Sequence, residues 1–531
     1  MGALPDGTGA VHFRVWAPAR KSVEVALEAE GGVRQLPLVA SSGGYFEGTH
    51  KAPIGARYRY RLDGRDSYPD PASRAQPDGP HGPSVIVDPG RFSWTDGEHK
   101  GPSSIKGQVL YELHVGTYTK EGTFKALEQQ LPALKDLGAT CLLLMPLNGF
   151  PGRFNWGYDG VNLFAPNATY GTPDELRALV DHAHRLGLSL LVDVVYNHLG
   201  PDGNYLWQYA RNYFSDSYPK EWGEPLNFDG EQSGPVRDFV LQNVRMWIRE
   251  YHFDGLRVDA TQCLYDRSRR HICQELTDEA RRAAGERRVL VIGESEPQSL
   301  EALILKEHGG WGMDGIWVDD FHHCARVALT RKHEAYLMDY RGAAQELLSC
   351  ALRNSLFQGQ RYNWQDKPRG GFLMHERPER IVTYLENHDQ ISNQLPSHGL
   401  SQLAGEAKTR AMTTLWLLLP QTPLIFMGQE FFSSFPFFYF CDHPEELQAA
   451  VRRGRAGYMK QFPTARRMLE EEGYLLPDGE KAFNASRLDL SERQTHSHAL
   501  LFHKELLWLR REDAVIREQD PTALAGAVLR D

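Results

Sequence analysis

The chain has 531 residues, a length that predicts about two to four domains. Hydrophobic residues make up 41% and charged residues 24%, which is typical of a globular protein, and no apolar run is long enough to cross a bilayer. The net charge of −10 leaves no basic surplus to neutralise phosphates. We therefore expect no nucleic-acid partner and no membrane partner.

The cysteines and the N-terminus indicate the compartment. Six cysteines are scattered along the chain without metal-ligand spacing, so we predict buried free thiols. The N-terminus lacks the charged and then apolar segment of a secretory signal. These features predict a cytoplasmic protein, and they predict nothing about its oligomeric state.

Residues 1–88 have the pattern of an all-β domain. The stretches VHFRVWAP, SVEVALEA and YRYRLDG alternate or are rich in β-forming residues, with glycine and proline between them. The segment 68–89 is rich in proline and predicts an ordered linker.

From residue 109 to residue 428, short apolar runs alternate with helical patterns. The runs lack a polar face, which is typical of strands buried on both sides. They cover 109–114, 139–146, 188–198, 254–260, 289–294, 315–321, 380–386 and 423–428. The helical patterns cover 123–137, 173–186, 236–251, 269–284, 342–351 and 403–418. This alternation predicts a (β/α)8 barrel within residues 89–440.

Two further segments are predicted around this barrel. Residues 199–232 are too many for a simple loop and should form a small insertion on top of the barrel. Residues 441–531 should be a helical C-terminal segment without a full β-domain.

Three acidic residues lie at or just after the ends of predicted barrel strands: Asp259, Glu294 and Asp389. An acidic residue after a strand is often a helix N-cap. Catalytic side chains of barrel enzymes also project from the C-terminal ends of the strands. Three such residues, with Arg257 and His388 beside them, favour an active site over caps alone.

Two carboxyl groups flanking one bond are what glycosidic hydrolysis requires, and neighbouring residues suggest their roles. Arg257 lies two residues before Asp259, so both side chains point to the same face of the strand, and the guanidinium favours an ionised Asp259. Asp193, in the third predicted strand, is the expected buried partner of Arg257.

Glu294 has the surroundings of a proton donor. Apolar neighbours and the nearby Glu296 would both raise its pKa. Asp389 would then be a third carboxylate that stabilises developing charge. His198 and His388 follow strand ends, and we expect hydrogen-bonding roles rather than acid–base catalysis from them.

Four motifs, in order and suitably separated, resemble the strand-end motifs of glycoside hydrolase family 13, the α-amylase family. They are DVVYNH (193–198), GLRVDA (255–260), GES (293–295) and ENHDQ (386–390). The resemblance implies a retaining hydrolase of α-glucosidic bonds. It also implies that Asp259 is the nucleophile, Glu294 the acid/base and Asp389 the stabiliser of the transition state.

The same resemblance implies contacts with the innermost glucose unit. WGYDG (156–160) matches the family's stacking tyrosine and its neighbour. The matching substrate-binding positions are Tyr158, Asp159, His198, Arg257 and His388.

Position along the chain adds two further sets of candidate substrate-binding residues. Aromatic rings offer flat faces to sugars, so we expect Trp156, Trp317 and Phe321 to line the cleft. Polar side chains after the sixth strand could bind the leaving group; these are Asp320 and His322, with Asp319 and His323 beside them.

Longer stretches resemble those members of the family that release trehalose from maltooligosyltrehalose. FPGRFNWGYDGVNLFAP, DDFHH and PFFYFCDH are examples, and the resemblance covers about residues 11–515. It implies an N-terminal β-sandwich similar to a carbohydrate-binding module, and a C-terminal β-domain that this chain would lack or carry in reduced form. The segments 395–403 and 428–434 depart from the pattern and could alter outer subsites.

Several functions therefore remain open. The first is trehalose release from a maltooligosaccharide-type substrate. The alternatives are an amylase-type hydrolase of starch and maltooligosaccharides, a branching or transglycosylating enzyme, and a glucan-binding protein without catalysis. We expect no cofactor and no metal, because Asn197 and Asp202, the possible calcium ligands, are of the types common in turns.

Overall fold

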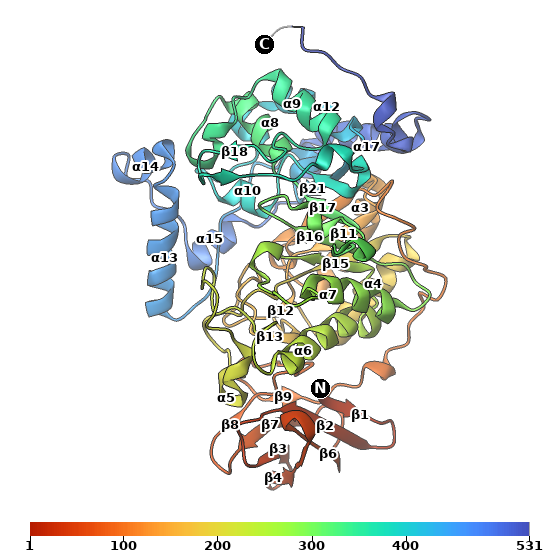
Figure 1. Ribbon diagram of the computed structural model, residues 1–531, viewed down its shortest axis with the longest axis vertical. Coiled ribbons are helices and arrows are strands. Elements are labelled where there is room, and N and C mark those ends of the chain that lie inside the picture. Colours follow the sequence, from red (N-terminus) through yellow and green to blue (C-terminus); the bar gives the residue numbers. More distant parts are fainter. Residues whose placement is uncertain (530–531) are drawn as a thin grey trace.

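The computed structural model describes residues 1–529. It begins with two antiparallel sheets at one end of the molecule (Figure 1). One sheet has the order β1 (Gly2–Pro5), β2 (Ala10–Trp16), β6 (Tyr45–Lys51) and β5 (Val39–Ser41). The other has β4 (Gly32–Pro37), β3 (Val23–Ala29), β7 (Arg57–Leu62) and β8 (Ser67–Tyr68), with β9 (Ser84–Val85) also on β7.

The alternating pattern of these strands builds the core between the two sheets. In β7 the sequence RYRYRL buries Tyr58, Tyr60 and Leu62 and leaves the arginines half-buried. The Tyr58 ring packs edge-on against Phe13 of β2, with ring centroids 5.3 Å apart. The β-sandwich implied by the sequence is therefore confirmed.

The predicted insertion 199–232 lies where the sandwich meets the barrel. It contains α5 (Leu206–Tyr209), and the Tyr209 hydroxyl donates to the Pro69 carbonyl over 2.8 Å. Tyr213 packs edge-on against Trp16 of the sandwich, with ring centroids 5.0 Å apart. The insertion therefore joins the two folded units.

Eight parallel strands close into the predicted barrel in chain order, because β21 pairs with β10. The strands are β10 (Leu110–Leu113), β11 (Cys141–Leu144), β14 (Ser189–Val194), β15 (Gly255–Val258), β16 (Leu290–Glu294), β17 (Gly315–Trp317), β20 (Ile381–Thr383) and β21 (Thr422–Phe426). Nearly every strand residue is buried, as the non-alternating apolar runs predict.

Helices cover the outside of the barrel. They are α2 (Phe124–Glu128), α3 (Leu131–Leu137), α4 (Pro173–Arg185), α6 (Ser233–Arg245), α7 (Ile272–Ala284), α8 (Asp320–Thr330), α9 (Ala344–Arg353), α12 (Glu406–Leu418) and α17 (Ser497–Glu512). Local signals set their ends: Thr172 and Glu175 form a capping box at the start of α4, and Gly138 ends α3 with a φ of 109°.

The structure corrects the end of the sixth strand and adds short elements that the sequence pattern did not predict. The sixth strand ends at Trp317 rather than residue 321, and α8 begins three residues later. Only two 3-10 turns, at 300–302 and 306–308, connect β16 to β17. Two short antiparallel pairs were not predicted, namely β12 (Asn148–Gly149) with β13 (Asn162–Pro166) and β18 (Arg361–Tyr362) with β19 (Lys367–Pro368).

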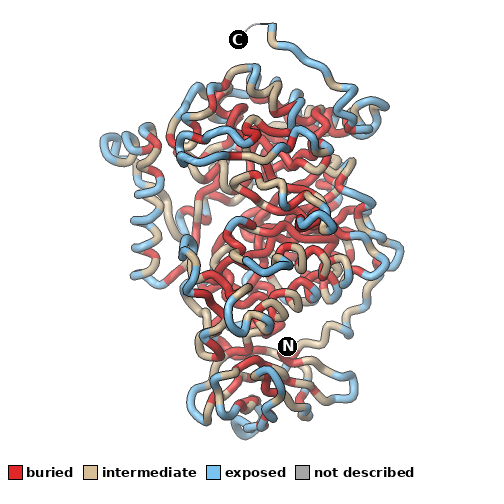
Figure 2. Tube along the Cα trace, viewed as in Figure 1, coloured by how far each residue is buried: buried red, intermediate tan, exposed pale blue. Residues whose placement is uncertain are grey.

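After β21, the described residues up to 529 form only helices, turns and loops. Two of the helices, α13 (Glu445–Met459) and α14 (Pro463–Glu470), extend as an arm beside the barrel (Figure 1). The outer side of this arm is exposed (Figure 2). The chain then returns through α15 (Gly479–Ala485) and α16 (Glu492–Thr495) to α17, which packs against α3 and α12.

Two expectations about composition can also be compared with the structure. All six cysteines are buried and free, as predicted. Among residues 1–529, no helix combines the length and apolar character that a membrane crossing needs.

Candidate active site

The predicted carboxylates lie at the C-terminal ends of neighbouring barrel strands. Asp259 directly follows β15, and Glu294 is the last residue of the adjacent strand β16. Asp389 lies in the short helix α10 (His388–Ser392), which follows β20. After Asp259 the chain turns sharply at Ala260, whose φ is 39° and whose backbone N–H donates to Glu294 Oε2 over 2.9 Å.

Arg257 lies beneath two of these carboxylates and bridges them. Its Nη1 donates to Asp259 Oδ1 over 2.7 Å, and its Nη2 is ion-paired with Glu294 Oε2 at the same distance. Nη1 also contacts both carboxylate oxygens of Asp193, at 2.8 and 2.9 Å. Asp193 is therefore the buried partner of Arg257, as predicted, because the two residues are opposite each other in the β14–β15 pairing.

Exposure increases from this arginine outward. The side chains of Arg257 and Asp193 are 0% exposed, whereas those of Asp259, Glu294 and Asp389 are 13%, 23% and 37% exposed. The fixed charges thus form the floor of the site, and the three predicted catalytic carboxylates face the solvent side. A substrate can reach the carboxylates but not the arginine that orients them.

Burial and neighbouring charges shift the pKa values of both bridged carboxyl groups. Burial raises the pKa of Glu294 to about 8, Asp259 and Asp389 add to this, and Arg257 opposes it. Burial also raises the pKa of Asp259, but there Arg257 and a 2.9 Å hydrogen bond from the Asn197 side chain oppose it. Glu294 is therefore suited to carry a proton at neutral pH, whereas Arg257 and Asn197 favour the ionised form of Asp259.

The prediction that Glu296 raises the pKa of Glu294 is wrong. Glu296 is paired with Arg369, and its Oε2 lies 3.8 Å from the Lys367 Nζ. Its charge is therefore satisfied elsewhere, and the raised pKa of Glu294 comes from burial and the other two carboxylates.

His388 lies between Asp389 and Glu112, a glutamate for which the sequence analysis predicted no role. His388 Nδ1 is 2.7 Å from Glu112 Oε1, and its Nε2 is 3.4 Å from Asp389 Oδ2. Burial lowers the pKa of His388, but Asp389 and Glu112 outweigh this and raise it to about 9. A charged imidazolium is thus held beside Asp389, and the only sequence signal for Glu112 was an acidic residue inside the apolar first strand.

Tyr158 lies beside this group, as predicted. Its hydroxyl donates to Asp193 Oδ2 over 2.6 Å, and its ring stacks on His388 with centroids 5.1 Å apart. Trp156 contacts the same histidine edge-on at 5.2 Å, and its Nε1 donates to the Phe438 carbonyl over 2.9 Å. These two aromatic residues therefore wall the site on the side of the loop between β12 and β13.

Asp159 and His198 lie next to this wall. Asp159 Oδ2 accepts from Asn155 over 2.7 Å and is 3.2 Å from His443 Nε2. His198 Nδ1 is bonded to the Asn197 side chain, and burial lowers the pKa of His198. Both residues are thus already held by protein groups, and their contact with a sugar stays a prediction.

The structure contradicts the expectation that Asp320, Phe321 and His322 line the cleft. All three lie in the first turn of α8 and are at most 1% exposed. Asp320 accepts bonds from Tyr340 and Gln298 and from two backbone N–H groups, and His322 Nδ1 is 2.5 Å from the Leu385 carbonyl. The strand ends earlier than predicted, so the helix turns these side chains into the core.

Trp317 also differs from its expected place. It is 2% exposed, and its ring lies 4.4 Å from the Arg257 guanidinium carbon. Trp317 is therefore part of the floor beneath Arg257 rather than the wall. Asp319, 21% exposed, is the acidic residue after β17 that stays accessible, and its Oδ1 accepts from Gln390 over 3.1 Å.

Two groups of side chains within residues 1–529 have the composition of metal ligands. One is His99, His184 and Asp254, at the opposite end of the barrel, where both histidines bind Asp254 at 2.9 Å. The other is Asp159, Cys441 and His443. Of the two possible calcium ligands, Asn197 donates to Asp259 over 2.9 Å, and Asp202 lies 3.3 Å from His81.

Comparisons with known proteins agree with this arrangement. Residues 1–89 match carbohydrate-binding module 48, the isoamylase N-terminal domain, and residues 86–232 match the catalytic domain of α-amylase. The malto-oligosyltrehalose trehalohydrolase of Deinococcus radiodurans is 40% identical, over 99% of this chain and 86% of the relative. That of Saccharolobus solfataricus is 36% identical, over 94% and 85%. The solved structure of a putative α-amylase from Salmonella typhimurium superposes with a TM-score of 0.90 at 33% identity, covering 100% of this chain and 89% of that one.

Proposed function

The chain belongs to the malto-oligosyltrehalose trehalohydrolase family, and we propose that it hydrolyses the α-1,4-glucosidic bond that joins trehalose to a maltooligosaccharide. The single observation that best supports this chemistry is the bridge from Arg257 to both Asp259 and Glu294. It holds two carboxyl groups together at one site, which a retaining glycosidase needs.

The proposed first step forms a covalent intermediate. Glu294, whose pKa is about 8, donates its proton to the glycosidic oxygen of the leaving trehalose. The Asp259 carboxylate attacks the anomeric carbon from the other side, and the bond to trehalose breaks. Asp389 and the ring of Tyr158 would face the developing positive charge on the sugar.

The proposed second step returns the enzyme to its first state. Glu294, now ionised, accepts a proton from a water molecule, and the resulting hydroxide attacks the anomeric carbon and displaces Asp259. The two inversions leave the new reducing end in the α configuration. We expect the carboxyl groups of Asp259 and Glu294 to be about 5–6 Å apart, as retention requires.

The proposal extends to the roles of the remaining parts. The N-terminal β-sandwich packs against the insertion 199–232 and would mainly stabilise the barrel. Asp389, Tyr158, Asp159, His198, His388 and Trp156 would form the innermost glucose subsite, and the buried Arg257 would orient the carboxylates beneath it. A cytoplasmic location also belongs to the proposal, and cell fractionation would test it.

A comparison of two substrates of equal length tests the specificity. Maltotriosyltrehalose and maltopentaose each contain five glucose units, but only the first ends in trehalose. We expect kcat/KM for maltotriosyltrehalose to be at least about tenfold higher, which needs about 1.4 kcal/mol of preferential binding in the transition state. Equal rates, or a preference for starch, would favour an amylase-type hydrolase, and products longer than the substrate would identify a transglycosylase.

A further inference from the structure

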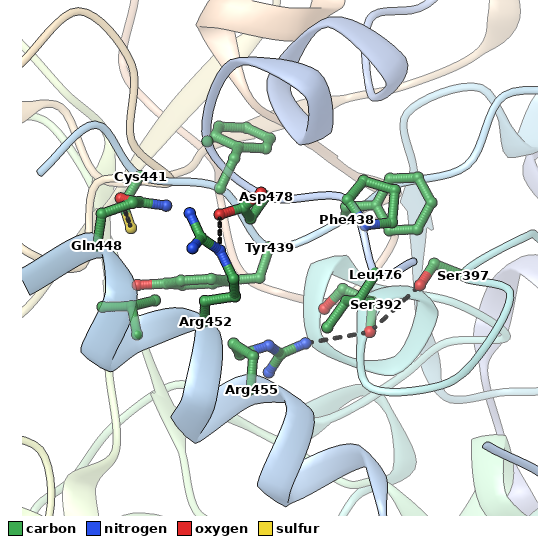
Figure 3. Close-up of a pocket in the computed structure, with 14 residues that line it drawn as sticks. Ser392, Ser397, Phe438, Tyr439, Cys441, Gln448, Arg452, Arg455, Leu476 and Asp478 are labelled. Atoms are coloured by element: carbon green, nitrogen blue, oxygen red, sulfur yellow. Dashed lines mark hydrogen bonds and ion pairs between the residues drawn. The ribbon is translucent and has the colours of Figure 1, made fainter. Parts of the chain in front are cut away.

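The arm formed by α13 and α14 contacts the segment that carries Asp389. Figure 3 shows the inner side of α13 with Arg455, whose guanidinium points toward α10 and is joined to Ser392. Arg455 Nη2 donates to the Ser392 carbonyl over 3.2 Å, and its Nη1 donates to Asn393 Oδ1 over 2.8 Å. One arginine of the arm thus binds both residues that end the short helix α10.

These two residues are directly connected to Asp389. The Asn393 backbone N–H donates to the Asp389 carbonyl over 2.8 Å, and the Asn393 side-chain amide lies 3.4 Å from Asp389 Oδ1. A continuous path of polar contacts therefore runs from Arg455 through Asn393 to the carboxylate. It holds Asn393 with its oxygen toward the arginine and its N–H2 group toward Asp389.

Asp389 has few other restraints. Its side chain is 37% exposed, and its other oxygen is 3.4 Å from His388 Nε2. α10 is only five residues long and cannot hold its own geometry without tertiary contacts. The position of Asp389 therefore depends on contacts at the end of α10, where Arg455 binds.

Arg455 itself is held in place by aromatic rings. Its guanidinium carbon lies 5.2 Å from the Tyr439 ring centroid and 5.5 Å from that of Tyr458. Tyr439 belongs to the loop after β21, so the arginine joins three separate segments. A lysine has one point charge and cannot reproduce the two fixed N–H directions toward Asn393 and Ser392.

We propose that Arg455 is a positioning residue that holds Asp389, through Asn393, in the orientation needed for catalysis. This inference rests on the proposed function, in which Asp389 stabilises the transition state. It predicts that the arm on α13 contributes to turnover although Arg455 does not touch the substrate.

The test compares Arg455→Gln and Arg455→Lys with Arg452→Gln as the matched control. Arg452 lies one turn earlier on α13 and lines the same pocket, but it pairs with Asp478 at 2.6 Å rather than with a residue of α10. We expect Arg455→Gln to lower kcat about 10- to 100-fold with less than about a threefold change in KM, because a small misplacement of a catalytic group has this effect. Arg455→Lys should recover only part of the loss, and Arg452→Gln should stay within about twofold of the parent.

A double-mutant cycle distinguishes positioning from general destabilisation. If Arg455 acts through Asn393, then Arg455→Gln combined with Asn393→Ala should reduce kcat no further than the stronger single change. Fully additive losses, or a kcat for Arg455→Gln within about twofold of the parent, would overturn the proposal.

A crystal structure of Arg455→Gln gives an answer that does not depend on the substrate. The proposal predicts that the Asp389 carboxylate moves or adopts two conformers while Asp259 and Glu294 keep their positions. An unmoved Asp389 would overturn the inference, even if the parent enzyme releases trehalose. If the parent enzyme fails to release trehalose, the proposed function is wrong. The crystallographic result would still decide whether Arg455 positions Asp389.

Discussion

Glu112→Gln should make His388 lose its charge at a lower pH. The His388 side chain is 2% exposed and lies between two carboxylates, those of Glu112 and Asp389. Burial lowers its pKa, but Asp389 and Glu112 outweigh burial and raise it from the usual 6.5 to about 9. Glutamine keeps an oxygen for the His388 backbone N–H, which donates to Glu112 Oε2 over 3.1 Å, but it removes the negative charge.

The size of the effect follows from the pKa of His388. The rise from 6.5 to about 9 corresponds to roughly 3 kcal/mol in favour of the charged ring. Since two carboxylates contribute, we assign about 1–2 kcal/mol to Glu112, so the variant's pKa should fall by about one. Because folding raises this pKa, the stabilisation is complete below pH 6.5 and is lost as the pH rises through about 9. In Glu112→Gln, this stabilisation should be lost completely at a lower pH than in the parent.

The assay is a ring-nitrogen NMR titration of His388 together with the pH dependence of kcat/KM. We expect the variant to lose activity at a lower pH than the parent on the alkaline side and to remain active near pH 6. Glu128→Gln is the matched control, because Glu128 pairs with the half-buried His182 at 3.1 Å far from the carboxylates. If His388 in Glu112→Gln still titrates near pH 9, the account of this ion pair is wrong.

Three further predictions concern the site and its support. Asp259→Asn should lower turnover by about 10³-fold or more, because an amide cannot replace the nucleophile, and should change the melting temperature by no more than a few degrees. Activity within tenfold of the parent would show that Asp259 is not the nucleophile. Tyr158→Phe should keep the ring on His388 but lose the 2.6 Å hydrogen bond to Asp193, so kcat/KM should fall by roughly 3- to 30-fold. A loss of kcat/KM as large as that of Tyr158→Ala would show that the hydroxyl alone matters. Asp254→Asn should destabilise the fold by about 3–5 kcal/mol in urea unfolding, because it breaks a buried charge network with His184. Burial opposes ionisation of Asp254, but bonds from His184 and His99 lower its pKa to about 2. This stabilisation is therefore present above about pH 4 and is lost in the parent as the pH falls toward 2. A parent whose free energy of unfolding does not change over that range would contradict this prediction.

The barrel and its carboxylates could be predicted because they depend on local patterns. Non-alternating apolar runs identified all eight strands; Asp259 directly follows one of those strands, and Glu294 is the last residue of the next. Arg257 and Asp193 could be paired because each lies inside a strand with one face toward the barrel interior.

The parts that could not be predicted depend on tertiary structure. The run from 315 to 321 is apolar enough for a strand, but the strand ends at Trp317 and Asp320 turns inward to bind two backbone N–H groups at 356 and 357. Glu112 is far from His388 in sequence, so their pairing follows from closure of the barrel. Arg455 lies in a charged helix whose position beside the barrel no local pattern indicates.

Time-resolved proton NMR of maltotriosyltrehalose hydrolysis tests the central claim most directly, because one spectrum reports both the products and their configuration. The account predicts that trehalose and maltotriose appear together and that the new reducing end of maltotriose is first seen as the α-anomer, with the β-anomer growing later by mutarotation. Initial formation of the β-anomer would contradict the covalent mechanism through Asp259. Release of glucose or maltose without trehalose would contradict the proposed specificity.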